Sequence, residues 1–246
     1  EMREAGVQPD AVSWNTLMVS YRSSPRASVD MRAVMGEMQA AGVVPDVATW
    51  NTLMSSYSEP ADLRGVMQEM QGADISPDVY SWNTLMKSCQ HPPQIRTVME
   101  EMRAAGVEPN VATWALLMRA HKQPLAVQKV IDEMLAAGVA PDSFSYSILF
   151  NSYLKKGGAR EVIAIFESHL KESPGLINNY IVTAVVRALA AVGSEADIMT
   201  FWDMYKDRLS ASDLNFLLHL SLRGINIDSR RWHWVNDLIA ATASSA

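Results

Sequence analysis

Cysteine is nearly absent from this sequence, since Cys89 is the single cysteine among 246 residues. One cysteine excludes an intramolecular disulfide framework and a zinc site built from several thiolates. A run of about 18 apolar residues, the length that a membrane-spanning helix needs, is missing too. We therefore expect neither a disulfide-stabilised domain nor insertion into a membrane.

A basic excess is also lacking. The 21 Lys and Arg residues are outnumbered by 27 Asp and Glu residues, which gives a formal net charge of −6. Proteins that hold nucleic acid mainly through its phosphates usually carry the opposite balance. The five histidines stand in unrelated contexts, none paired with a carboxylate at metal-ligand spacing, so we predict neither an enzyme nor a bound cofactor. These histidines are His91, His121, His169, His219 and His233.

A ten-residue motif, in contrast, is present several times. Its clearest copy, Pro-Asp-Val-Ala-Thr-Trp-Asn-Thr-Leu-Met, begins at Pro45, and similar copies begin at Pro9, Pro77 and Pro109, with a more divergent one at Pro141. Successive copies start 36, 32, 32 and 32 residues apart. A fixed period in this range is typical of stacked repeats. Function is therefore expected along a surface rather than in one enclosed pocket.

The motif itself predicts a helix. Trp50, Leu53 and Met54 follow the i, i+3, i+4 spacing of one helical face. Asp46 precedes that helix, where its carboxylate can accept a hydrogen bond from the first turn, and Pro45 sharpens the start. We expect the Trp of each copy to lie in the core rather than to stack on a ligand.

A second helix is predicted in each unit, with Val66, Met67 and Met70 as its apolar face and a Glu facing water. An Ala-Gly-Val segment such as 41–43 then ends the helix, because Gly tolerates the left-handed conformation. Each unit is thus a helical hairpin that buries its apolar face only by stacking. The later units are four residues shorter than the first, which is about one helical turn. We expect the second helix of the later units to be shorter by that turn. The Glu residues expected to face water are Glu37, Glu69, Glu101 and Glu133.

The predicted organisation is all-α. Residues 1–10 are interpreted as the end of a truncated repeat, so the sequence is expected to be part of a longer chain, and residues 178–246 as degenerate hairpins that cap the array. Trp232, Val235 and Ile239 are expected to pack inward in that cap, although the basic and aromatic segment 230–234 also fits a nucleic-acid contact. The five predicted units are 11–46, 47–78, 79–110, 111–142 and 143–177. The predicted tail helices are 176–192, 194–208, 211–223 and 229–242.

The pattern Val-x-Thr-Trp-Asn-Thr-Leu-Met, then a helix ending in Glu-Met, then Ala-Gly-Val-x-Pro-Asp, resembles the pentatricopeptide repeat family of mitochondria and plastids. This resemblance implies a right-handed α-solenoid whose first helices line a groove that binds single-stranded RNA, one base per repeat. It implies that the fifth residue of a unit and the last residue before the next unit read the base, while the second residue flanks it.

Transferred residue by residue, the resemblance gives four reading pairs. The first two imply uracil, the third a pyrimidine, most often cytosine, and the fourth reads nothing because Ala115 carries no amide or hydroxyl. Each last residue also stands where a helix cap stands, so capping explains it equally well. The pairs are Asn15 with Asp46, Asn51 with Asp78, Asn83 with Asn110, and Ala115 with Asp142. The flanking positions hold Val12, Ala48, Tyr80, Ala112 and Phe144.

The resemblance also implies a phosphate-binding lysine near the thirteenth position of each unit. Only the fifth unit has one, Lys155, and the first four units have Ser23, Glu59, His91 and Gln123 there. Two hypotheses follow. One is a non-catalytic organellar adaptor or stabiliser of single-stranded RNA. The other is a structural subunit of a large organellar ribonucleoprotein, the mitochondrial ribosome first, contacting ribosomal RNA and neighbouring subunits. The expected location is the mitochondrion, with the plastid as the alternative.

Overall fold

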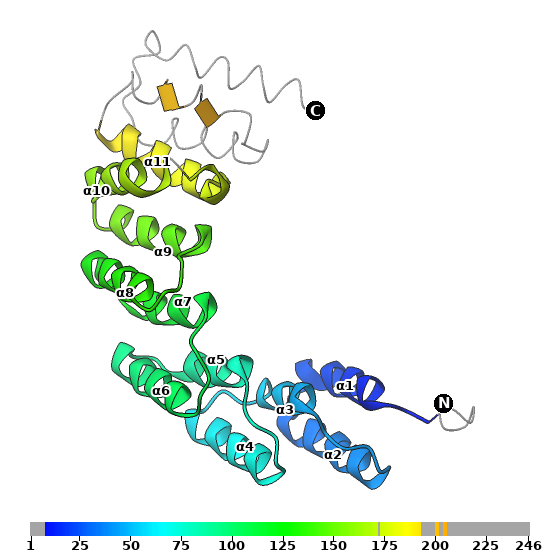
Figure 1. Ribbon diagram of the computed structural model, residues 1–246. Helices are drawn as coiled ribbons and strands as arrows, with labels where there is room; N and C mark the ends of the chain where they lie inside the picture. The colour runs from blue at the N-terminus through cyan, green and yellow to red at the C-terminus, as the bar shows by residue number, and fades with distance from the viewer. Residues whose placement is uncertain (1–7, 172, 193–199, 202–203, 206–246) are drawn as a thin grey trace, which may run out of the picture. The chain divides into compact units, whose positions relative to one another are not determined.

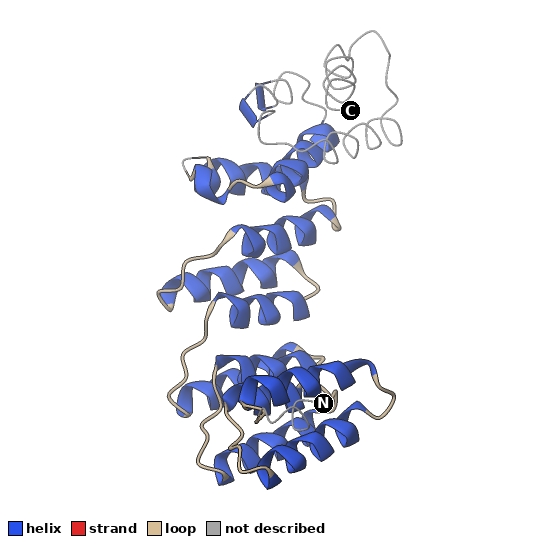
Figure 2. Ribbon diagram, turned by 90° about the vertical axis from the view of Figure 1, so that its right-hand side faces the viewer, coloured by secondary structure: helices blue, strands red, loops and turns tan. Residues whose placement is uncertain are grey.

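The computed structural model describes residues 8–171, 173–192, 200–201 and 204–205. Within these residues all regular structure is helical (Figure 2), so the predicted all-α class is confirmed. The helices follow one another in pairs along the chain (Figure 1). They are α1 (Ala11–Ser20), α2 (Ala27–Ala40), α3 (Val47–Met54), α4 (Pro60–Gly72), α5 (Val79–Ser88), α6 (Pro92–Ala104), α7 (Val111–Ala120), α8 (Pro124–Ala136), α9 (Ser143–Leu154), α10 (Ala159–Ile165) and α11 (Asn179–Val192). Three short turns of helix, η1 (Tyr21–Ser23), η2 (Phe166–Leu170) and η3 (Pro174–Leu176), complete the set.

Capping carboxylates begin the first helix of most units. Oδ1 of Asp46 accepts a hydrogen bond from the Thr49 backbone N–H at 2.8 Å, and Oδ1 of Asp78 accepts one from the Ser81 N–H at 2.9 Å. Asn110 does the same for Thr113 at 3.0 Å. These bonds satisfy backbone donors that have no partner inside the helix. The Pro-Asp boundaries predicted from the sequence are therefore real helix starts.

The second helices end on a residue in the left-handed conformation. Gly42, Gly106 and Gly138 have φ between 76° and 78°, and Asp74 takes the same place in the second unit with φ 60°. The Val43 backbone N–H donates to the Met38 carbonyl at 3.1 Å, which closes the last turn. Asp tolerates this conformation better than most residues with a side chain, so the turn persists without glycine.

The length difference between the units falls mainly outside the second helix. Helix α2 has 14 residues and α4 has 13, so the prediction that a whole turn is lost from this helix is wrong. The first unit instead places residues in the turn η1 between its two helices. Both second helices bury four side chains of one face. Removing a turn would remove part of that face from the core.

The chain divides into two compact units, residues 1–120 and 121–246. In the first compact unit, α1, α3 and α5 each pack against the second helix of their own hairpin and against the first helix of the next hairpin, which for α5 is α7. In the second compact unit, α8 packs against α9, and α9 packs against α10 and α11. We call the surface formed by α1, α3, α5 and α7 the helix-A surface.

The core consists of the apolar stripes predicted from the motif. Trp50, Leu53 and Met54 of α3 are buried, as are their counterparts in α5 and α7. Burial of the Trp side chains confirms their interpretation as core residues. The second helices contribute a Val-Met or Val-Ile pair and a following Met, namely Val34, Met35 and Met38; Val66, Met67 and Met70; Val98, Met99 and Met102; and Val130, Ile131 and Met134.

Ion pairs connect successive second helices in the first compact unit. The Arg32 guanidinium binds Glu69 with both terminal nitrogens, at 2.8 and 3.0 Å, and Arg64 binds Glu101 at 2.7 and 3.1 Å. Two of the glutamates predicted simply to face water therefore have partners in the preceding unit. Because these side chains remain over a third exposed, the pairs fix register more than they add stability.

Helix α11 lies within the predicted tail helix 176–192 and buries Ile181, Val182 and Val185, among others. The other tail predictions, 194–208, 211–223 and 229–242, and the inward packing of Trp232, Val235 and Ile239, lie outside the described residues apart from 200–201 and 204–205. So does most of the segment 1–10. Among the helices that the structure describes, none combines the length and apolar character of a membrane span.

The stacking of units predicts unequal costs for the same substitution. Leu53 is fully buried between units, whereas Leu17, at the same place in the first unit, is 41% exposed. We expect Leu53→Ala to lower the free energy of unfolding by about 2–5 kcal/mol. Leu17→Ala should cost less than about 1 kcal/mol. Urea unfolding followed by circular dichroism measures both, and equal losses would contradict stacking as the source of core burial.

Candidate nucleic-acid interface

The fifth-position asparagine of the second unit is held between two units. Asn51 lies on α3 and is only 8% exposed. Its Nδ2 donates to Oδ1 of Asp78 at 3.1 Å, and its Oδ1 accepts from the Ser81 hydroxyl at 2.6 Å. The two residues that the resemblance pairs for base reading are thus directly hydrogen-bonded to each other.

The third unit repeats this arrangement with one change. Asn83 on α5 is 7% exposed, and its Oδ1 accepts from the Thr113 hydroxyl at 2.8 Å. The same hydroxyl lies 3.1 Å from Oδ1 of Asn110, the other member of the predicted pair. Thr113 therefore connects the two residues.

The first pair is looser. Asn15 on α1 is half-buried, and its Nδ2 lies 3.5 Å from Oδ1 of Asp46, at the limit of a hydrogen bond. Its Oδ1 is buried and has no hydrogen-bond partner among the described residues. In the fourth pair Ala115 is buried at the end of the first compact unit, while Asp142 belongs to the second.

Capping and pairing are combined in the same carboxylates. Burial acts to raise the pKa of Asp78, but hydrogen bonds from the Ser81 backbone N–H, the Asn51 amide and the Ser81 hydroxyl outweigh it, so the pKa lies below its ordinary value of 3.8. Asp46 shows the same balance between burial and bonds from Thr49 and Asn15. Both carboxylates are therefore ionised at neutral pH. The three hydrogen bonds that Asn51 and Ser81 donate to the Asp78 carboxylate all go to Oδ1.

The second-position residues leave apolar surface uncovered. Val12 is 71% exposed, Tyr80 49% and Phe144 52%, and Ala48 and Ala112 are exposed as well. Apolar side chains at one repeated position on the surface indicate a binding face more than chance exposure. Phe144 lies on α9 and Lys155 directly follows it, so both belong to the second compact unit, as Asp142 does.

A hollow of about 560 Å³ brings part of the predicted site together. It is lined by Asn51 and Asp78, the reading pair of the second unit, and by Ala48 and Tyr80, the flanking residues of the second and third units. The other uncharged residues that line the hollow are Val19, Val47, Thr52 and Ser55.

Sequence reasoning missed the cations of this surface. Arg22 lines the hollow. It is the twelfth residue of its unit, one place before the thirteenth position at which the resemblance implies a lysine. The Lys87 ammonium lies 5.6 Å from the centre of the Tyr80 ring, within the range of a cation–π contact. Lys87 is at the ninth position of its unit, and Val19 and Ser55 at the ninth position of theirs line the hollow. The shared ninth position was the sequence signal that could have identified Lys87 as part of this surface.

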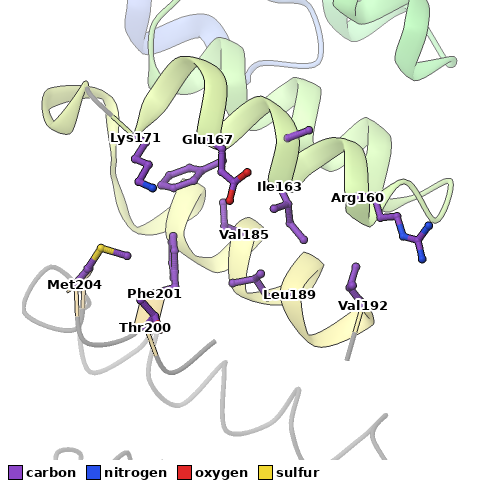
Figure 3. Close-up of a pocket in the computed structure, with 12 residues that line it drawn as sticks. Arg160, Ile163, Glu167, Lys171, Val185, Leu189, Val192, Thr200, Phe201 and Met204 are labelled. Carbon is purple, nitrogen blue, oxygen red and sulfur yellow. The ribbon is translucent and has the colours of Figure 1, made fainter. Parts of the chain in front are cut away.

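A second hollow lies in the other compact unit, between α10 and α11, and is drawn in Figure 3. Its wall is mainly apolar, with Ile163, Val185 and Leu189, and Arg160, Glu167 and Lys171 are the charged residues that line it (Figure 3). It holds none of the predicted site residues.

Groups for catalysis are not assembled in the described part of the chain. It contains no cluster of three or more His, Cys, Asp or Glu side chains that could hold a metal ion. Burial raises the pKa of the Cys89 thiol, which disfavours the reactive thiolate.

Consecutive helical hairpins with the same residue types at repeated positions define a helical repeat protein. The model of the pentatricopeptide repeat domain matches residues 1–60, 33–91, 65–123 and 97–156, so the chain belongs to the pentatricopeptide repeat family. Among curated proteins, no sequence matches the chain.

Solved structures share the fold. The maize pentatricopeptide repeat protein PPR10 is 20% identical with a TM-score of 0.64, and matches 100% of this chain and 36% of its own. PPR10 in complex with an 18-nucleotide psaJ RNA element is 21% identical with a TM-score of 0.70 over 99% and 36%. The pentatricopeptide repeat domain of Arabidopsis thaliana protein-only RNase P 1, in complex with tRNA, is 18% identical with a TM-score of 0.50 over 65% and 89%. The chain thus spans just over a third of PPR10.

The depressed pKa of Asp78 predicts a loss of stability in acid. Its hydrogen bonds favour the ionised form, so their contribution is complete well above pH 3.8 and is lost as the pH falls through the lower folded-state value. Asp78→Asn keeps a capping oxygen, as Asn110 shows, but cannot titrate. Between about pH 6 and pH 3, wild type should lose more free energy of unfolding than Asp78→Asn in urea titrations. Parallel losses would exclude Asp78 as a source of acid sensitivity.

Proposed function

We propose that this protein binds single-stranded RNA along its helix-A surface, without catalysis, as an adaptor or stabiliser of the RNA. The observation that carries the proposal is the hollow that gathers Asn51, Asp78, Ala48, Tyr80 and Arg22. It places hydrogen-bonding groups, flanking surfaces and a positive charge together, which are the three kinds of contact that an unpaired nucleotide offers.

The hydrogen-bonding groups suit the edge of a base. Asn51 uses one of its two amide N–H groups on Asp78 and keeps the other. Oδ2 of Asp78 can accept a hydrogen bond from an N–H group of the base, directly or through a water. A donor beside an acceptor complements the edge of a pyrimidine, which fits the uracil that the resemblance implies for this pair.

Flanking surfaces are unequal on the two sides of the hollow. Tyr80 offers an aromatic face on which a base can stack, and such stacking contributes about 1–3 kcal/mol per base. Ala48 offers only a methyl group. We therefore propose that most of the stacking at this unit comes from Tyr80.

The RNA tract should be short and its free affinity modest. The net charge of −6 opposes phosphate binding, and the thirteenth positions of the first four units carry no lysine. Arg22 and Lys87 supply part of the missing positive charge. We propose an organellar setting, the mitochondrion or alternatively the plastid, on the strength of the family resemblance.

A second candidate function is a structural subunit of a large organellar ribonucleoprotein such as the mitochondrial ribosome. The acidic balance favours it, because neighbouring proteins would supply the affinity for ribosomal RNA that this chain lacks. The two are separated by a pull-down from organelle extract with and without RNase, followed by sedimentation. Release as a small particle bearing pyrimidine-rich RNA supports the adaptor, and an RNase-resistant ribosome-sized particle supports the subunit.

Direct base reading predicts a loss of RNA binding when the two buried asparagines are removed. Asn51→Ala with Asn83→Ala should weaken binding of a uridine-rich oligonucleotide by about 5- to 150-fold, because two lost bonds each contribute about 0.5–1.5 kcal/mol. Fluorescence anisotropy measures the affinity and circular dichroism the fold. The control, Gln68→Ala with Gln71→Ala, removes two exposed amides from α4. Unchanged binding by the asparagine variant would show that the bases are not read here.

Phosphate contact by the two cations predicts a change in salt dependence. Arg22→Ala with Lys87→Ala should reduce the slope of log affinity against log salt by about 1.4, since each contact to single strands contributes about 0.7. The control removes Lys129 and Arg160, exposed cations on second helices of hairpins. A slope that falls equally in both variants would place the phosphates elsewhere.

A further inference from the structure

A hydroxyl group is buried at the third position of four consecutive units. Thr49, Ser81, Thr113 and Ser145 all have 0% exposure. Their backbone N–H groups make the cap hydrogen bonds described above, a local role that needs no hydroxyl. A buried hydroxyl nevertheless requires a partner, and its choice of partner differs between the units.

Two of these hydroxyls reach back to the asparagine of the preceding unit. The Ser81 hydroxyl donates to Oδ1 of Asn51 at 2.6 Å, and the Thr113 hydroxyl donates to Oδ1 of Asn83 at 2.8 Å. Thr49 differs, because its hydroxyl donates at 2.7 Å to Oδ1 of Asp46, its own cap. Among the described residues, Oδ1 of the preceding asparagine, Asn15, has no hydrogen-bond partner, and its Nδ2 makes one contact of 3.5 Å.

We propose that Ser81 and Thr113 are positioning residues that set the base selectivity of the preceding asparagine, an inference that rests on the proposed function. A hydroxyl that donates to the amide oxygen fixes which end of the amide is turned inward. The NH₂ end must then face the other way, which for Asn51 is toward Asp78 and the hollow. The asparagine is thereby committed to donate to a base rather than to accept from it.

Unequal selectivity along the array follows from this arrangement. Asn51 is held at both ends of its amide, Asn83 by the Thr113 hydroxyl, and Asn15 by one long contact. The first unit should therefore tolerate different bases better than the second and third, although its predicted reading residues, Asn and Asp, are identical to those of the second.

The chain supplies a matched set of variants. Thr113→Val removes the hydroxyl and keeps the shape of the side chain. Thr113→Ser retains a hydroxyl, as Ser81 does at the same position. Thr49→Val removes a hydroxyl that donates to its own cap residue, Asp46. Thr113→Val and Thr49→Val should both lower the melting temperature, because each removes a buried hydroxyl, and Thr113→Val also leaves Oδ1 of Asn83 without its donor. A loss of stability therefore does not distinguish a positioning role from a capping role, whereas selectivity does.

RNA selectivity is the first readout. Short single-stranded RNAs carrying U-U-N and N-U-U, with all four bases at N, cover both strand directions. Thr113→Val should reduce the discrimination among bases at N by about 2- to 12-fold, the effect of one hydrogen bond. Thr113→Ser should recover it, and Thr49→Val should leave it unchanged. Equal discrimination in wild type and Thr113→Val would overturn the proposal.

Nuclear magnetic resonance of the free protein gives a readout that needs no RNA. The side-chain NH₂ signals of Asn83 should shift and lose order in Thr113→Val, while those of Asn15 stay unchanged in Thr49→Val. Unchanged Asn83 signals would overturn the positioning role even if RNA binds. If wild type binds no RNA while the Asn83 signals change as expected, the proposed function fails and the positioning contact stands.

Discussion

Burial of the Trp-Leu-Met face of each first helix between neighbouring units is the constraint on which the rest of the structure depends. Helices of 8 to 14 residues cannot bury an apolar face alone. Stacking solves this, and it also sets where one unit meets the next. Leu53 and Leu85 are fully buried for that reason, whereas Leu17 in the first unit is not.

The same stacking creates the candidate site. A cap residue at the start of one unit and a mid-helix asparagine of the preceding unit come within hydrogen-bond distance because α3 and α5 pack side by side. Capping and pairing with Asn51 are therefore not competing explanations for Asp78. One oxygen of its carboxylate both caps the helix and accepts a hydrogen bond from Asn51.

Electrostatics limits what this surface can do. Arg22 and Lys87 stand near the hollow, but the chain as a whole is acidic. Selectivity in such a site comes from hydrogen bonds fixed in advance rather than from attraction to phosphates. Buried hydroxyls that hold an asparagine in one orientation serve that purpose at no cost in net charge.

The sequence by itself determined the helical pairs, their starts at Pro-Asp and their buried stripes, because periodicity and capping are local properties of the chain. It misplaced the four extra residues of the first unit in α2, since a connection such as η1 depends on what the core must keep buried. The pairing of Asn51 with Asp78 was available only through family resemblance. The hydroxyl contacts of Ser81 and Thr113 with the preceding asparagines were decided by tertiary structure, because they join residues that are 30 apart in the sequence. The place of Arg22 in the wall of the hollow was decided there too, because residues of three repeat units form that wall.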